Sequence, residues 1–187
     1  MAINLKRRML YIPVLHIDTN LINARQKMPD VNQLEKWCSD GVILINMAGI
    51  ARAEALVGGD ARRSEKANRQ IFTTTPAASA HSAPFKAVEE VLFPTGAQSE
   101  NQRNDVRIVA DAIHYASILV TLDGGSKSQP GGILGNRDAL AKRFQIRILK
   151  PNEAAEFVRV KIHERDEFNR QFVREFGGEL PDWTGKD

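Results

Sequence analysis

Cysteine is almost absent from this chain of 187 residues, which contains Cys38 and no other. A single thiol excludes an internal disulfide and any zinc site built from several cysteines. The lack of cystines is consistent with a reducing compartment, so we expect a cytoplasmic protein. The basic amino-terminal stretch MAINLKRRML is not followed by an apolar segment, and a secretory signal is therefore not expected.

Long apolar runs and a strong charge imbalance are also missing. No run approaches the roughly 18 apolar residues of a membrane-spanning helix, so we expect no membrane partner. Lysine and arginine number 26 and the acids 23, a net charge of +3 that permits a polyanionic partner without establishing one. Aromatic residues make up 6% and hydrophobic residues 42%, which is enough for a packed core and excludes general disorder.

The arrangement of apolar residues predicts an α/β fold. Four short runs have the composition of buried parallel strands: Tyr11–Ile17, Val42–Asn46, Ile118–Leu122 and Gln145–Leu149. Helical patterns lie between them, at Val31–Cys38, Met47–Val57 and Asp105–Ala116, the last with Asn104 as its expected N-cap. This alternation predicts a twisted parallel sheet of four or five strands with helices on both faces.

Three segments fall outside this alternation. Phe72–Pro84 is low in complexity and is predicted to be a loop, and Gly124–Gly135 is predicted to be a glycine-rich loop. From about Phe157 the chain carries an apolar stripe at helical spacing, which Gly177 ends: Phe168, Phe172, Val173 and Phe176. Apolar helix faces usually pack on their own domain, but an arm for a dimer or another partner stays open. We therefore divide the chain into a domain of residues 1–158 and a helical extension of residues 159–187.

Acidic residues occur where the predicted strands end. Asp18 follows the first strand and Asp123 the third, while Glu54 and Asp105 lie on the helices beside them. Each acid alone has an ordinary explanation, as a helix cap, a turn residue or a solvated side chain. Together they would repel one another at short range, and a hard divalent cation such as Mg²⁺ or Mn²⁺ would remove that cost.

These residues resemble the PIN domain, a fold of metal-dependent nucleases that includes the VapC-type ribonuclease toxins. The resemblance is carried by HIDTN around Asp18, ARAEAL around Glu54, and NDVRIVADAIHYASILVTLDG at residues 104–124. In the last block Asp105 and Asp123 are eighteen positions apart, with Thr121 in the Thr-x-Asp pattern of the family. The resemblance spans about residues 11–158 and implies a PIN-like three-layer fold. The chain departs from compact members in its long segment between Glu54 and Asp105.

The resemblance implies a site and an activity. Its metal-binding and catalytic acids correspond to Asp18, Glu54, Asp105 and Asp123, and the surrounding polar positions to Thr19, Asn20 and Thr121. Asp111, about 120° further round the helix than Asp105, is expected to support the ligands rather than join them.

The implied function is a metal-dependent endoribonuclease that hydrolyses RNA phosphodiester bonds with metal-activated water. A toxin of a toxin–antitoxin pair is one role within this class, and it brings a homodimer and an antitoxin protein as expected partners. An alternative of a different class stays open, in which a catalytically silent PIN-like module binds RNA or a protein. Turnover, rather than metal binding, would separate the two hypotheses.

Overall fold

The computed structural model describes residues 7–24, 27–48, 73–75, 83–125 and 131–187. Within these residues, five parallel strands form one sheet in the order β3-β2-β1-β4-β5. The strands are β1 (Leu15–Ile17), β2 (Ile45–Ala48), β3 (Thr73–Thr75), β4 (Ile118–Val120) and β5 (Arg147–Leu149). The predicted α/β class, with a parallel sheet of four or five strands, is therefore confirmed.

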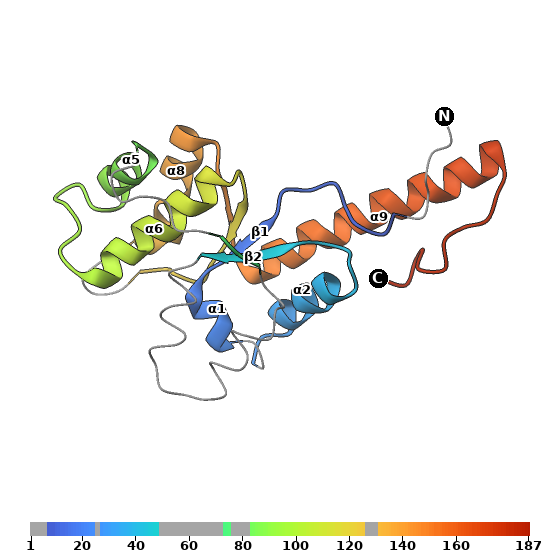
Figure 1. Ribbon diagram of the computed structural model, residues 1–187, viewed down its shortest axis with the longest axis horizontal. Coiled ribbons are helices and arrows are strands. Elements are labelled where there is room, and N and C mark those ends of the chain that lie inside the picture. Colours follow the sequence, from blue (N-terminus) through green and yellow to red (C-terminus); the bar gives the residue numbers. More distant parts are fainter. Residues whose placement is uncertain (1–6, 25–26, 49–72, 76–82, 126–130) are drawn as a thin grey trace.

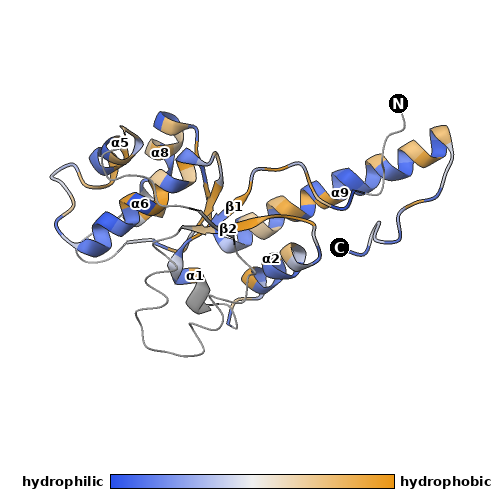
Figure 2. Ribbon diagram, in the orientation of Figure 1, coloured by the Kyte–Doolittle hydropathy of each residue, from blue (hydrophilic) through white to orange (hydrophobic). Residues whose placement is uncertain are grey.

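Helices cover both faces of this sheet, as Figure 1 shows. One face carries α5 (Ala83–Leu92), α6 (Glu100–His114) and α8 (Arg137–Phe144), and the other carries α2 (Pro29–Ser39) and α9 (Pro151–Phe176). Two short helices, α1 (Thr19–Ala24) and α7 (Gly132–Gly135), follow β1 and β4 along the chain. Polar residues occupy the outer side of α6 in Figure 2, whereas Val106 and Val109 on its inner side are fully buried. The three layers thus enclose one apolar core.

The strand register places two chain segments side by side at the carboxyl edge of the sheet. Leu15 lies opposite Ile118, and Ile17 lies opposite Val120. The backbone N–H of Asp18 then donates to the carbonyl of Val120 at 3.0 Å. The residues that follow β1 and β4 therefore leave the sheet next to each other.

All four predicted strands occur, but each is shorter or shifted. β1 begins at Leu15 rather than Tyr11, and Tyr11 is 84% exposed. β2 begins only at Ile45, although Val42 is fully buried. The N–H of Val42 donates to the carbonyl of Trp37 at 2.8 Å, so this apolar residue belongs to the connection from α2. β4 ends at Val120 and β5 begins at Arg147. Thr121 and Ile146 are buried just outside these strands, whereas Leu122 and Gln145, the predicted ends, are exposed.

The N-cap predicted for α6 is wrong. The helix begins at Glu100, and its cap is Ser99, whose hydroxyl accepts from the backbone N–H of Gln102 while the Gln102 side chain accepts in return. This reciprocal capping box satisfies donors that the first helical turn leaves without partners. Asp105 consequently lies in the second turn of the helix and does not open it.

Two further predictions fail where the sequence pattern is weak. Met47 and Ala48, predicted to begin a helix, belong to β2, and the rest of Met47–Val57 lies outside the described residues. Within the predicted loop Phe72–Pro84, Thr73–Thr75 form β3 beside β2, and α5 begins at Ala83. Threonine is β-branched and favours strands, which explains how a low-complexity segment extends the sheet.

The carboxyl-terminal helix is one continuous element. α9 runs from Pro151 to Phe176, so the predicted boundary after residue 158 falls inside it, and the division into two domains stays a prediction. Its first half packs on α2 and β5, and Val158 and Ile162 in this half are buried. Its second half projects beyond the sheet (Figure 1), and Phe168 and Phe176 are 53% and 71% exposed. The expectation that this stripe packs on its own domain is wrong for these two residues.

A network of charges holds residues 177–187 against the projecting half of α9. Arg165 Nη2 donates to Asp166 Oδ1 at 2.7 Å and to Asp187 Oδ2 at 2.8 Å, and Arg8 Nε donates to Asp187 Oδ1 at 2.8 Å. Trp183 stacks on Arg165, with 4.3 Å from the guanidinium carbon to the ring centroid. Burial raises the pKa of Asp187, but the hydrogen bonds from both arginines outweigh it and hold that pKa below its usual value.

A histidine at the centre of β1 makes the stability of the fold depend on pH. His16 is fully buried, and neither ring nitrogen has a hydrogen-bond partner among the described residues. Burial lowers its pKa to about 4 from 6.5. Between these two pH values the histidine is therefore protonated in the unfolded chain and neutral in the folded chain. We expect the free energy of unfolding, measured by urea titration in EDTA, to be unaffected by this group above pH 6.5. It should fall by about 3 kcal/mol as the pH drops from 6.5 to 4.

The matched variant for this prediction is His16→Leu, which replaces the imidazole with an apolar side chain of similar size that cannot bind a proton. Its unfolding free energy should lack the part of the decline that lies between pH 6.5 and pH 4. An unchanged decline in this variant would assign the pH dependence to other groups.

None of the helices in the described part of the chain combines the length and apolar character needed to cross a bilayer.

Candidate active site

Asp18 lies at the carboxyl end of β1, where the sheet and α1 meet. Its side chain is almost completely buried, and its Oδ2 accepts from the Thr121 hydroxyl at 2.6 Å and from Asn20 Nδ2 at 2.8 Å. The backbone N–H groups of Thr19 and Asn20 also donate to this carboxylate, so Asp18 caps α1 as well. Burial raises the pKa of Asp18 and the charge of Asp123 adds to the rise, against the hydrogen bonds that lower it.

Asp123 lies two residues beyond Thr121, after the end of β4. Its Oδ2 accepts from the backbone N–H of Ile133 at 2.7 Å, and its Oδ1 accepts from that of Gly125 at 3.3 Å. Its carbonyl oxygen accepts from the N–H of Leu134 at 2.9 Å. Asp123 thus fixes α7 to the end of β4, and its carboxylate is held in one orientation.

Thr121 connects the two acids. It is fully buried; its hydroxyl donates to Asp18 and accepts from the backbone N–H of Asp123 at 2.9 Å. A single hydroxyl can do both because it has one proton and two lone pairs. Thr121 therefore links the carboxylate of Asp18 to the backbone of Asp123, and these two acids are hereafter the acid pair.

The acid pair lies at the point where the order of strands reverses. From β1 the chain adds β2 and β3 on one side, then returns to add β4 and β5 on the other. In open parallel sheets, ligands bind outside the carboxyl ends of the strands at this switch point. The topology thus identifies the same place as the acids do, and it does so independently of them.

The structure brings together some of the predicted site residues. Asp18, Thr19, Asn20, Thr121 and Asp123 form one hydrogen-bonded network. Asp105 is half-buried in the second turn of α6, whereas Asp111 is fully buried nearer the end of that helix. Glu54 lies outside the described residues. Among those that are described, no three acid, histidine or cysteine side chains stand close enough to hold a metal ion, so the four-acid cluster stays a prediction.

The acid pair itself is suited to a hard cation. Both side chains offer oxygen ligands, and Mg²⁺ commonly binds through one or two carboxylates while keeping several waters. A cation between them would offset the repulsion that contributes to the raised pKa of Asp18. The chemistry of these donors therefore fits Mg²⁺ or Mn²⁺ better than a metal that prefers thiolate or imidazole.

Sequence reasoning missed the backbone groups that orient Asp123. The amides of Gly125 and Ile133 reach the carboxylate because Gly132 lies against it: a Cβ on Gly132 would be 2.7 Å from Asp123 Oδ2. Gly132 also has a φ of +52°, in the region that favours glycine. The glycine pair at residues 131–132 was the available signal, although its contact with Asp123 depends on how the loop folds.

These features define a class: an α/β protein with two acids at the carboxyl edge of a parallel sheet, consistent with a PIN-like fold. No known family model matches the sequence, and no curated protein matches it either. Among solved structures, the chain is similar to one in the crystal structure of VapBC2 from Rickettsia felis bound to a DNA fragment from their promoter. The two are 19% identical over 73% of this chain and 98% of that chain, with a TM-score of 0.45. Similarity at this level does not extend to activity or partners.

Proposed function

We propose that this protein is an endoribonuclease that hydrolyses RNA phosphodiester bonds with Mg²⁺ or Mn²⁺ bound at the carboxyl edge of its sheet. The proposed metal ligands are Asp18, Glu54, Asp105 and Asp123. The observation that supports this most is the acid pair at the topological switch point, in which buried Asp18 is linked through Thr121 to the backbone of Asp123. The choice of RNA as substrate rests on the resemblance of residues 104–124 to the PIN domain.

The roles of the chain's own residues follow from their contacts. Asp18 and Asp123 would hold the cation; Thr121 would orient the carboxylate of Asp18, and the amides of Ile133 and Gly125 would orient that of Asp123. Asn20 donates to Asp18 and would hold it in the orientation that ligation needs. A bound divalent ion would supply acidity to an attacking water and offset charge that develops on the phosphate.

The test is cleavage of a panel of single-stranded and structured RNAs by the purified protein. We expect cleavage with Mn²⁺ or Mg²⁺ that leaves 5′-phosphate and 3′-hydroxyl ends, and no cleavage in excess EDTA. The Asp18→Asn variant provides the inactive reference, and Asp182→Asn, which changes an exposed acid of the tail, provides the matched control. Cleavage that persists in EDTA and in Asp18→Asn would contradict the proposal.

A catalytically silent module that binds RNA or a protein is the second candidate. It is supported by the structural roles of both acids, because Asp18 caps α1 and Asp123 binds the backbone of α7. Such roles would preserve the acids without catalysis. RNA binding with no turnover, at equal levels in wild type and Asp18→Asn, would support this candidate over the nuclease.

Two partners complete the proposal. We propose a homodimer, supported by the exposed phenylalanines of α9, and an antitoxin protein if the chain acts as a toxin. Light scattering of the purified protein would measure the first. Loss of RNA cleavage on adding the product of a neighbouring gene would test the second.

A further inference from the structure

The edge of the sheet formed by β5 has no neighbouring strand among the described residues. The strand order ends at β5, so within the described part of the chain no other strand pairs with its outer side. Short natural edges are usually protected by charge, by a bulge or by a covering helix, because free backbone groups there pair readily with another chain. The surroundings of β5 therefore decide what this edge can accept.

The register identifies the backbone groups that face outward. Leu149 lies opposite Val120, and its carbonyl accepts from the N–H of Thr121 at 3.0 Å, so Leu149 pairs inward with β4. In a parallel ladder, adjacent residues direct their N–H and C=O groups to opposite sides. Those of Ile148 consequently point away from the sheet, where an added strand would meet them.

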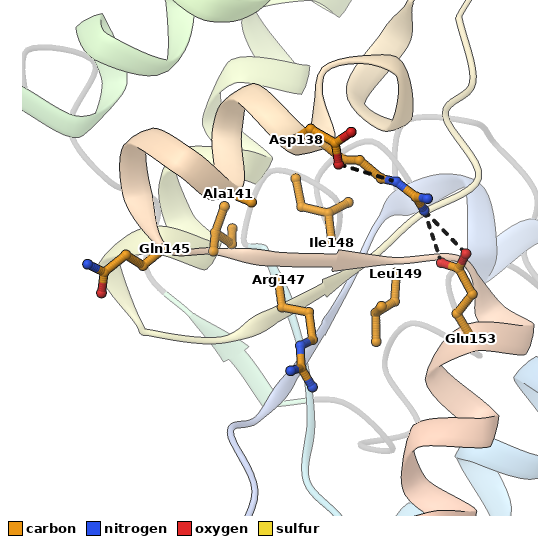
Figure 3. Close-up of a pocket in the computed structure, with 9 residues that line it drawn as sticks. Asp138, Ala141, Gln145, Arg147, Ile148, Leu149 and Glu153 are labelled. Carbon is orange, nitrogen blue, oxygen red and sulfur yellow. Dashed lines mark hydrogen bonds and ion pairs between the residues drawn. The ribbon is translucent and has the colours of Figure 1, made fainter.

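A groove accompanies this edge. It consists of two pockets of about 480 Å³ each, which share Gln145, Ile146 and Arg147 in their linings. The first pocket extends along β5 to Glu153, beneath α8 (Figure 3). The second lies at the amino end of β4, and its lining includes the apolar side chains of Ile113, Phe144 and Phe157. These two pockets together are hereafter the β5 groove.

Charge in the β5 groove is balanced except at one residue. Arg137 pairs with Glu153 at 3.2 Å and closes the end near α9, as the dashed lines in Figure 3 mark. Arg147 points to the opposite side of the strand from Ile148 (Figure 3), and its guanidinium carbon lies 4.9 Å from the centroid of Phe157. It is exposed, and it has no ion pair with a described acid. A cation without an acidic partner among the described residues therefore lies where the two pockets meet.

We propose that the β5 groove binds an extended peptide segment of a protein partner, which adds to the sheet at β5. Ile148 would provide the main-chain hydrogen bonds, the pocket lined by Phe144 and Phe157 would take an apolar side chain, and Arg147 would pair with a neighbouring acidic side chain. This combination of a free edge with side-chain pockets is an established way of recognising peptides. The proposal is independent of RNA cleavage, because the β5 groove does not include the acid pair.

The β5 groove suits a peptide better than RNA. Its first pocket carries two arginines and two acids, so it has no excess of positive charge to attract a phosphate backbone. Its second pocket combines apolar side chains with Ser117 and Gln145, and Arg147 is its one charged lining residue. Backbone groups that point outward from a strand match the spacing of a peptide and not that of a nucleotide chain.

The experiment uses a phage-displayed library of random linear peptides selected on the full-length protein, followed by fluorescence polarisation with the enriched peptides. We expect enriched sequences to place an apolar residue beside an acid. Arg147→Glu should weaken their binding about tenfold or more, which one lost ion pair can account for. Lys142→Glu is the matched control, because Lys142 is exposed on nearby α8 but lines neither pocket.

A second measurement tests strand addition without altering the protein. Two N-methylated versions of the peptide are compared, one methylated at odd-numbered and one at even-numbered backbone nitrogens. The version whose methyl groups face β5 should not bind, and the other should bind as the unmodified peptide does. Three results would overturn the proposal: equal loss of binding in both versions, binding of a labelled oligouridine in place of any peptide, or a protein dimer that Arg147→Glu dissociates. RNA cleavage that is unaffected by Arg147→Glu would keep this outcome separate from that of the proposed nuclease.

Discussion

Replacing Asp18 with asparagine is expected to lower metal-dependent RNA cleavage by about 10³-fold while leaving the fold intact. The loss corresponds to about 4 kcal/mol of transition-state stabilisation, the scale of a contribution from a bound metal ion. The amide has nearly the same shape as the carboxylate, and its oxygen can still accept from Thr121. It removes a negative charge that is costly to bury, as the raised pKa of Asp18 indicates. Unfolding free energy should therefore be equal or higher in this variant.

A loss of cleavage activity without a loss of unfolding free energy would separate a role in the site from a role in folding. A variant that merely damaged the fold would lose both, whereas a ligand removed from a strained acidic site loses activity alone. Rates should be measured at saturating Mn²⁺, and unfolding by urea titration in EDTA, with Asp182→Asn beside it in both. Activity within about tenfold of wild type would mean that Asp18 serves only to cap α1.

The acid pair could be predicted from sequence because its position follows from topology. Asp18 and Asp123 come directly after buried apolar runs, and parallel strands end at one edge of the sheet. The pairing of β1 with β4 then brings the two acids together, and Thr121 joins them. Asp105 could be placed on a helix but not relative to the pair, because a helix can slide and rotate on a sheet without any change in its apolar pattern.

The ends of the elements were harder to predict than their existence. Val42 and Val120 are both fully buried, yet Val120 lies in a strand and Val42 in a connection. The difference lies in their hydrogen-bond partners, since Val42 donates to Trp37 at the end of α2. The pattern of apolar residues indicates which residues are buried, but not which backbone groups they bond with. Ser99 and Gln102, by contrast, fit the capping-box spacing in the sequence itself, so the beginning of α6 was predictable.

The projecting part of α9 shows a different limit. The stripe from Phe168 to Phe176 has the helical spacing of a core-facing side, and the helix forms as the pattern predicts. The spacing of apolar residues does not show how far the sheet extends beneath the helix. The sheet ends before the helix does, and charges on Arg8, Arg165 and Asp187 hold the tail there in place of apolar packing.

Gly132→Ala is expected to damage both stability and activity through Asp123. An added Cβ would collide with the backbone nitrogen of Gly125 and lie 2.7 Å and 2.8 Å from Asp123 Oδ2 and the Asp123 carbonyl oxygen. The φ of +52° adds strain that only glycine avoids. We expect a loss of about 2 kcal/mol in unfolding free energy. Displacing the Asp123 carboxylate by a fraction of an ångström should slow RNA cleavage by about 10-fold to 100-fold.

Gly135→Ala provides the matched control three residues further on, at the end of the same short helix α7. A Cβ there would meet nothing within 4 Å, and alanine favours helical backbone over glycine, so its stability should be unchanged or slightly higher. Urea titration and cleavage rates for both variants compare the same chemical change at a crowded and at an open position. If Gly132→Ala behaved as Gly135→Ala does, the close contact between Gly132 and Asp123 would not be what holds the Asp123 carboxylate in place.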